Sequence, residues 1–115
     1  MKTIITVVIC VFLLVVACSK SNNDAVTPPA NCSTTITYAA NVSPLIQSFC
    51  ATNSGCHGSG SFNGPGELLT YQQVFSARSS IRSAVSSGRM PLNTTLSSEQ
   101  KSTITCWVDN GAINN

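Results

Sequence analysis

The side chains best suited to chemistry in this 115-residue chain lie close together in the sequence, between Cys50 and His57. Five residues separate the thiols of Cys50 and Cys56, and the only histidine of the chain directly follows the second thiol. Thiolates are nucleophiles and metal ligands, and a neutral imidazole is a common metal ligand. The segment therefore predicts a site of covalent attachment or metal binding.

The order cysteine, cysteine, histidine is typical of covalent haem attachment. In a C-x-x-C-H site the two thiols bond the vinyl groups of haem, and the histidine binds the iron. Cys56 and His57 keep the register of that motif, whereas five residues instead of two precede Cys56. We expect the flexible segment 53–55 to bring Cys50 back toward the second vinyl group.

Two other uses of the cysteines stay open. Of six cysteines, four would remain in an exported domain, and outside the cytoplasm these could form two disulfides with three alternative connectivities. Zinc also binds Cys and His, but a structural zinc site needs four ligands, usually in short paired spacings, which disfavours it here. The four cysteines are Cys32, Cys50, Cys56 and Cys106.

The N-terminus has the pattern of an export signal. Lys2 precedes an apolar run from Ile4 to Ala17, which is shorter than the ~20 residues needed to span a bilayer. The run ends in Val-Val-Ala-Cys at residues 15–18, which resembles the lipobox of bacterial lipoproteins, with valine where leucine is commonest. We expect a signal peptide at residues 1–17 and a lipid on Cys18.

The segment after the lipobox is polar and contains prolines, so residues 18–35 are predicted to be a flexible tether and residues 36–115 a single domain. The lipid would anchor the exported protein to a membrane without spanning it. Ser19 is not an acidic retention signal, which favours the outer membrane. The few charges are nearly balanced and scattered, so no nucleic-acid partner is expected.

Start and stop signals predict helices on both sides of a long loop. Ser43 as N-cap and Pro44 at the first position start a helix that runs into Cys50. The glycine-rich stretch 58–66 is predicted to be irregular.

Two more helices are predicted from Ser/Thr-x-x-Gln capping boxes at residues 70–73 and 97–100. The first should stop at Gly88, with a candidate break at residues 79–80, and the second should run to Gly111.

The last helix separates its cysteine from its apolar face. Ile104 and Trp107 share one face, whereas Cys106 points away from Ile104. Because this orientation is unfavourable for contact with a ligand in the core, we hypothesise that Cys106 forms a disulfide with Cys32. The other two cysteines of the domain would then bind haem.

Over about residues 40–113 the chain resembles the c-type cytochrome family. The shared features, in order, are a helix running into the cysteine motif, Cys56-His57-Gly58, a glycine-rich loop, a middle helix, Met90-Pro91 and a final helix with Trp107. The resemblance is to the short, divergent domains of exported lipoproteins, in which the cysteine spacing is often stretched. It implies a small all-α cytochrome c-like fold of three to four helices around a haem, with long loops.

The resemblance also implies a function. Haem c would be attached through Cys50 and Cys56, with its iron between His57 and the sulfur of Met90, although Met90 could instead fill a gap in the core. Such iron has no open position for substrate, so we expect a single-electron carrier with an unidentified redox-partner protein, and no enzyme activity. The apolar faces of the first and last helices would line the crevice, and Arg89 would be a surface charge or pair with a haem propionate.

Two alternatives belong to other classes of protein. A cytochrome-like lipoprotein module with a Cys50–Cys56 disulfide and no haem could bind a partner or ligand. The stretched spacing supports it, whereas His57 and Met90 count against it. A haem peroxidase would need an open distal position, against which Met90 argues.

Overall fold

All regular structure in the described part of the chain is helical. The computed structural model describes residues 32 and 34–115, so the predicted signal peptide, Cys18 and most of the tether lie outside the described residues. The elements are a π-helical turn, η1 (Tyr38–Val42), and three α-helices, α2 (Ser43–Phe49), α3 (Tyr71–Ser86) and α4 (Ser98–Asp109). The all-α prediction is confirmed. None of these helices has both the length and the apolar character needed to cross a membrane.

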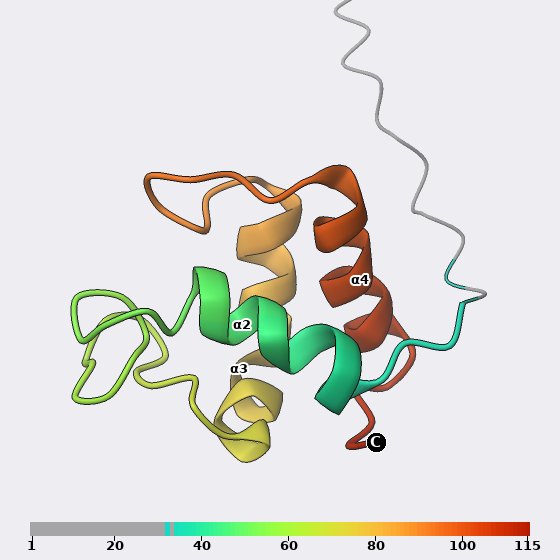
Figure 1. Ribbon diagram of the computed structural model, residues 1–115, viewed down its shortest axis with the longest axis horizontal. Helices are drawn as coiled ribbons and strands as arrows, with labels where there is room; N and C mark the ends of the chain where they lie inside the picture. Colours follow the sequence, from blue (N-terminus) through green and yellow to red (C-terminus); the bar gives the residue numbers. More distant parts are fainter. Residues whose placement is uncertain (1–31, 33) are drawn as a thin grey trace, which may run out of the picture.

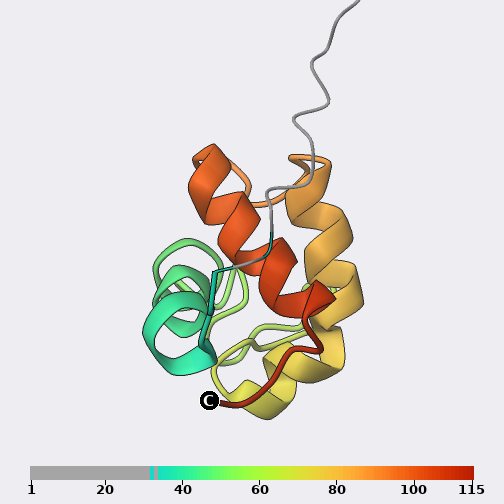
Figure 2. The same cartoon turned by 90° about the vertical axis from the view of Figure 1, so that its right-hand side faces the viewer.

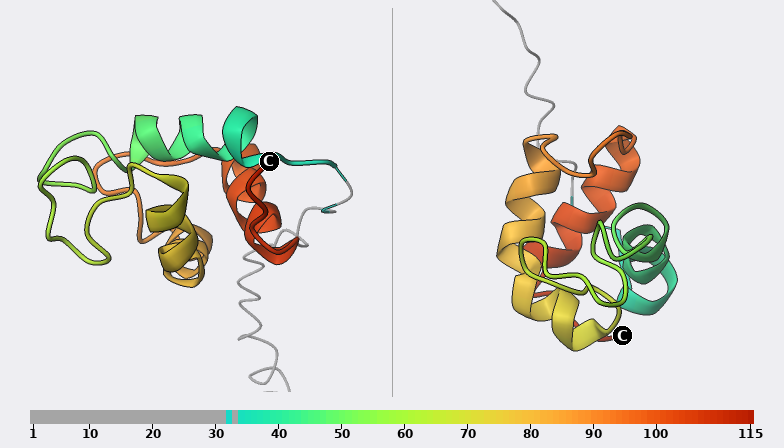
Figure 3. Two further views of the ribbon diagram at one scale, coloured as in Figure 1. Left: turned by 90° about the horizontal axis from the view of Figure 1, so that it is seen from below. Right: turned by 90° about the vertical axis from the view of Figure 1, so that its left-hand side faces the viewer.

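The three α-helices form two layers. α3 and α4 pack against each other, and η1 contacts both α2 and α4. α2 crosses over the α3–α4 pair, as the front view and the view from below show (Figure 1, Figure 3). The long segment between α2 and α3 and the segment between α3 and α4 lie on the same side of the helices (Figure 1).

Both predicted capping boxes are present. The Thr70 side chain accepts from the Gln73 backbone N–H at 3.3 Å, and the Gln73 side chain accepts from the Thr70 N–H at 2.9 Å. The same reciprocal bonds join Ser97 and Gln100 at the start of α4. Each box satisfies N–H groups that the first turn of a helix leaves without intrahelical partners.

Two predictions about α3 and α4 are wrong, one about a break inside α3 and one about the end of α4. α3 is continuous through Ser79 and Ser80, so the candidate break is wrong, because both serines lie on the exposed face while Ala77 and Ile81 are buried. α4 ends at Asp109, before Gly111. α3 ends close to Gly88, as predicted, and this glycine has the positive φ of 71° that L side chains rarely adopt.

The start of the first helix differs from the prediction. Ser43 is not an N-cap, because the chain is already helical through η1 and no side chain caps α2 at its start. Thr37 caps η1 instead, its hydroxyl accepting from the Ala40 N–H at 3.3 Å, while the Asn41 side chain accepts from the Thr37 N–H at 2.9 Å. Pro44 still occupies the first turn of α2.

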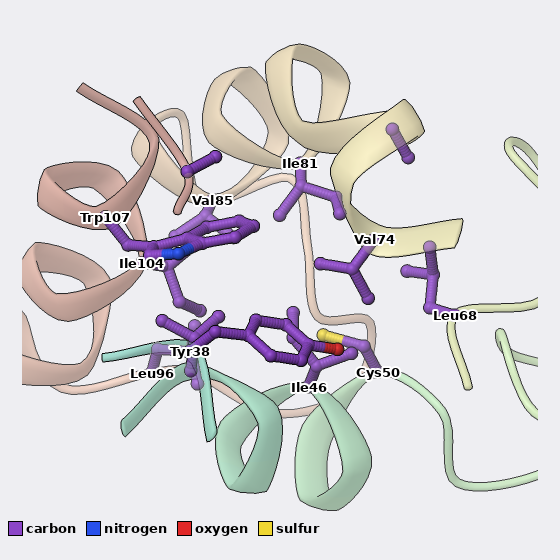
Figure 4. Packing of buried hydrophobic residues seen from close by; sticks show 13 residues of the cluster. Tyr38, Ile46, Cys50, Leu68, Val74, Ile81, Val85, Leu96, Ile104 and Trp107 are labelled. Atoms are coloured by element: carbon purple, nitrogen blue, oxygen red, sulfur yellow. The ribbon is translucent and has the colours of Figure 1, made fainter. Parts of the chain in front are cut away.

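The core lies between the two layers. Trp107 and Ile104 project from α4 toward Ile46 of α2 and Tyr38 of η1 (Figure 4). The rings of Tyr38 and Trp107 lie 5.5 Å apart between centroids. Burial of these large side chains is the main stabilising contribution. The whole cluster comprises Tyr38, Val42, Ile46, Cys50, Leu68, Val74, Ala77, Ile81, Val85, Leu96, Ile104, Trp107 and Ala112.

The C-terminal residues close the end of this core near η1 (Figure 2). The indole N–H of Trp107 donates to the Ile113 carbonyl at 3.0 Å, and the Tyr71 hydroxyl donates to the Ala112 carbonyl at 3.0 Å. Asn115 accepts from the Tyr38 N–H through its side chain and from the Ala39 N–H through its carbonyl. The indole N–H of Trp107 and the hydroxyl of the half-buried Tyr71 thus find partners in the last four residues.

The predicted Cys32–Cys106 disulfide is confirmed. The two Cα atoms are 5.2 Å apart, and the bond joins positions separated by 74 residues in sequence. The Asn110 side chain also donates to the Cys32 carbonyl at 3.4 Å. The start of the described chain is therefore fixed to α4, the last helix.

Candidate functional site

A cavity of about 720 Å³ opens beside the core, within the range of ~300–1,000 Å³ typical of small-molecule and cofactor sites. Its walls come from the end of α2, one face of α3 and the two long segments between helices. Most of the wall is apolar, and four of its residues also belong to the core cluster: Cys50, Leu68, Ile81 and Val85. The lining residues are Phe49, Cys50, Gly55, Cys56, His57, Asn63, Gly64, Pro65, Leu68, Ser80, Ile81, Ala84, Val85, Arg89, Met90, Pro91 and Leu92.

All four residues predicted to bind a cofactor line this single cavity. Cys50 directly follows α2, Cys56 and His57 come from the loop after it, and Met90 comes from the segment after α3. Residues 40 positions apart in the sequence therefore meet around one apolar space. The structure brings together two thiols, one imidazole and one thioether.

The last helix does not line the cavity, which corrects one prediction. No residue of α4 belongs to the wall, and the helical wall comes from Ile81, Ala84 and Val85 of α3 instead. The apolar face of α4 is used up in the core, where Ile104 and Trp107 are almost completely buried. α2 contributes to the wall only through Phe49 at its end.

The ring of His57 is held in one orientation. Its Nδ1 lies 2.9 Å from the Gly66 carbonyl oxygen. Because a carbonyl can only accept, Nδ1 carries the hydrogen, and a neutral ring then leaves the lone pair on Nε2. The His57 backbone is held as well, since the Leu68 N–H donates to its carbonyl at 2.8 Å. An N–H···O=C bond of this kind is the usual outer contact of a metal-binding histidine.

The two thiols of the cavity differ in exposure. Cys50 and Cys56 are both free cysteines in the structure, Cys50 being 8 % exposed and Cys56 half-buried. Burial, with a smaller contribution from the charge of a Cys56 thiolate, raises the pKa of Cys50 from 9.0 to about 11.

Alkylation of the cofactor-free protein with iodoacetamide should therefore modify Cys56 well before Cys50. The thiolate is the reacting form, and a pKa of about 11 lowers its fraction at pH 8 about 100-fold relative to a pKa of 9. Since the raised pKa keeps Cys50 protonated up to about pH 11, its rate should rise about tenfold per pH unit from pH 8 to 10. Peptide mapping by mass spectrometry measures both rates, and the protein unfolded in guanidinium is the control. Equal alkylation rates for Cys50 and Cys56 in the folded protein would contradict the raised pKa of Cys50.

Met90 and Arg89 lie together at the cavity. The Met90 N–H donates to the Ala84 carbonyl at 3.1 Å, which fixes the chain after α3. Met90 is half-buried and lies outside the buried core cluster, which weakens the interpretation that it only fills the core. Arg89 is exposed and, among the described residues, is the only Lys, Arg, Asp or Glu of the lining. This position is compatible with both interpretations of Arg89, a surface charge and a partner for a haem propionate.

Three contributions to the site were missed in the sequence. The Gly66 carbonyl, which orients His57, belongs to a backbone and leaves no signal beyond the glycine-rich loop. The wall from α3 could have been proposed from its apolar face, which the sequence does show. Leu92, 63 % exposed and part of the cavity wall, follows Met90-Pro91 and could have been noticed as an apolar residue in a polar loop.

Among residues 32 and 34–115, no three or more His, Cys, Asp or Glu side chains cluster in a way that could hold a metal ion. Comparison of the chain with family models, with curated proteins and with solved structures gives no significant match.

Proposed function

We propose that this domain is a c-type-cytochrome-like electron carrier, with haem c attached through Cys50 and Cys56 and with His57 and Met90 as the iron ligands. The sequence pattern at its N-terminus supports an exported protein anchored to a membrane, with the outer membrane favoured, through a lipid on Cys18. Its partner would be a redox protein.

The observation that carries the proposal is that these four side chains line the same apolar cavity. Covalent haem attachment needs thiols, and a His/Met pair is the ligand set of many cytochromes. The cavity has the size of a cofactor site, both cysteines are free thiols, and Met90 lies outside the buried core cluster. The residues present therefore fit haem c.

Each residue has a distinct task in this proposal. His57 offers the lone pair of Nε2 because the Gly66 carbonyl holds the hydrogen on Nδ1. The α3 wall and Phe49 would give a bound haem an apolar surface to pack against. Arg89 offers a positive charge to an anionic edge of the ligand, such as a propionate. When bound, haem supplies a centre that gains and loses one electron.

A second function is favoured by one observation, the apolar cavity itself. A binding module that lacks haem would need the cavity walls but neither His57 nor Met90, and its thiols could join as a Cys50–Cys56 disulfide. In the structure the two cysteines are free. This alternative becomes one of the outcomes of the test.

The test is a visible spectrum of the full chain, oxidised and dithionite-reduced, after production with and without haem-attachment machinery. We expect sharp reduced bands only with the machinery, and an intact mass under denaturing conditions that includes one covalent haem. The absence of bands, with a mass lower by the hydrogens of a second disulfide, would overturn the proposal and support the binding module. Bands that disappear on denaturing gel filtration would show non-covalent haem and would overturn attachment through the cysteines.

A further inference from the structure

The five residues between the two cysteines form a defined turn. The chain leaves α2 at Cys50 and reverses, so that the His57 backbone N–H donates to the Cys50 carbonyl at 2.9 Å. This bond spans the whole insertion. Cys50 itself stays fixed to the helix, since its N–H donates to the Ile46 carbonyl at 2.9 Å. Although five residues separate the cysteines, the backbone of His57, directly after Cys56, therefore returns to Cys50.

Asn53 is the centre of this turn. Its backbone carbonyl accepts from the N–H groups of Cys56 at 3.0 Å and of Gly58 at 2.8 Å. Its side-chain oxygen accepts from the Gly55 N–H at 2.8 Å. Side-chain bonds of this kind from asparagine to an N–H two residues on are common in tight turns. One residue thus holds the N–H groups of Gly55, Cys56 and Gly58, the first through its side chain and the other two through its backbone carbonyl.

Gly58 allows the turn to close. A Cβ at this buried position would lie 2.8 Å from the carbonyl carbon and oxygen of Asn53, which is too close for any side chain. Packing against the Asn53 backbone therefore requires glycine at the position after His57. Two contacts support the turn from the next loop: the Asn63 amide donates to the Gly55 carbonyl at 2.9 Å, and the Ser61 hydroxyl donates to the Cys56 carbonyl.

We propose that Asn53 is a positioning residue that folds the five-residue insertion into a turn and so returns the thiol of Cys56 to that of Cys50. The effect of the turn on the thiols does not depend on haem. Its consequence for two-point attachment rests on the proposed function.

The first measurement uses the cofactor-free full chain in glutathione redox buffers. Cys50 and Cys56 lose two hydrogens to oxidised glutathione, giving one protein disulfide and two reduced glutathiones. The equilibrium constant reports how closely the fold holds the two thiols together. We expect Asn53→Ala to lower this constant about tenfold, which corresponds to about 30 mV. Asn53→Asp keeps an acceptor for the Gly55 N–H and should restore most of the wild-type value.

Asn41→Ala is the matched control. Asn41 also uses its side-chain oxygen to accept from a backbone N–H, that of Thr37 at 2.9 Å, but it lies on η1. Each asparagine side chain also makes one hydrogen bond with a threonine hydroxyl, so each substitution removes two hydrogen bonds. Asn41→Ala should therefore lower stability by a similar amount, about 0.5–1.5 kcal/mol per lost hydrogen bond, without changing the thiol equilibrium. The proposal is overturned if Asn53→Ala behaves like Asn41→Ala in the redox buffers, or if the wild-type thiols pair no better when folded than in guanidinium.

The second measurement uses protein produced with the attachment machinery. After denaturation, iodoacetamide labels any cysteine that carries no thioether. We expect an increased labelled fraction at Cys50 in Asn53→Ala and little label in Asn41→Ala. If the wild type carries no haem but the redox result holds, the proposed function fails and the turn stands. If haem is attached and Asn53→Ala remains unlabelled, the consequence for attachment is wrong.

Discussion

A His57→Ala variant is expected to fold as the parent does and to lose the iron ligand on one side of the haem. The cofactor-free variant loses one bond, from Nδ1 to the Gly66 carbonyl, which costs about 0.5–1.5 kcal/mol. His57 is the only histidine of the chain, so no other imidazole can replace it. We therefore expect unchanged far-ultraviolet circular dichroism and a loss of at least about tenfold in the reduced visible bands.

Two controls make this result specific. Added imidazole should restore the reduced bands of His57→Ala, since the cavity then has room for the free ring. Met90→Ala, which removes the other proposed ligand from the same cavity, should keep the covalent haem mass while its spectrum changes. Wild-type bands in His57→Ala would show that the imidazole does not hold the iron, and an unchanged spectrum in Met90→Ala would reopen a haem enzyme with an open position.

Removal of the Cys32–Cys106 disulfide should cause the largest loss of stability. The bond closes a loop of 74 residues, for which the chain-entropy model gives about 4 kcal/mol. A small domain has only about 5–15 kcal/mol in total, so Cys32→Ala/Cys106→Ala should lower the urea midpoint strongly and lower Tm by roughly 15–30 °C. Urea unfolding followed by circular dichroism measures the effect.

A reductant supplies the matched comparison for the disulfide. It should lower the midpoint of the wild type to that of the double variant and leave the double variant unchanged, because Cys50 and Cys56 are already thiols. A wild-type midpoint that ignores the reductant would show that the cross-link contributes little.

Much of the helical structure could be predicted from local patterns. A capping box is a contact between residues three apart, so the pairs at 70–73 and 97–100 determine their helix starts without help from the rest of the chain. The start of α2 could not be predicted in this way. Ser43-Pro44 has the same local signal whether or not η1 precedes it, and the turn exists because Tyr38 and Val42 are buried against the core.

The part of the candidate site that consists of residues adjacent in sequence could be predicted. Cys56 and His57 are neighbours, and the position of Cys106 on its helix correctly indicated a partner outside the cavity. The sequence did not predict which helix forms the wall of the cavity. α3 and α4 both have an apolar face, and only their packing decides that α4 fills the core while α3 borders the cavity. Asn53 was read as part of a flexible segment, whereas its hydrogen bonds make that segment a fixed turn.

The Cys32–Cys106 bond also determines what a single proteolytic cut would do. Every residue of the cavity wall, from Phe49 to Leu92, lies between the two joined cysteines. The exposed residues 92–95, between α3 and α4, are the kind of loop tip that proteases cut. One cut there would add a single water to the mass and leave two pieces linked through the disulfide. Such a nicked domain would remain one covalent molecule, and its pieces would separate only under reducing conditions.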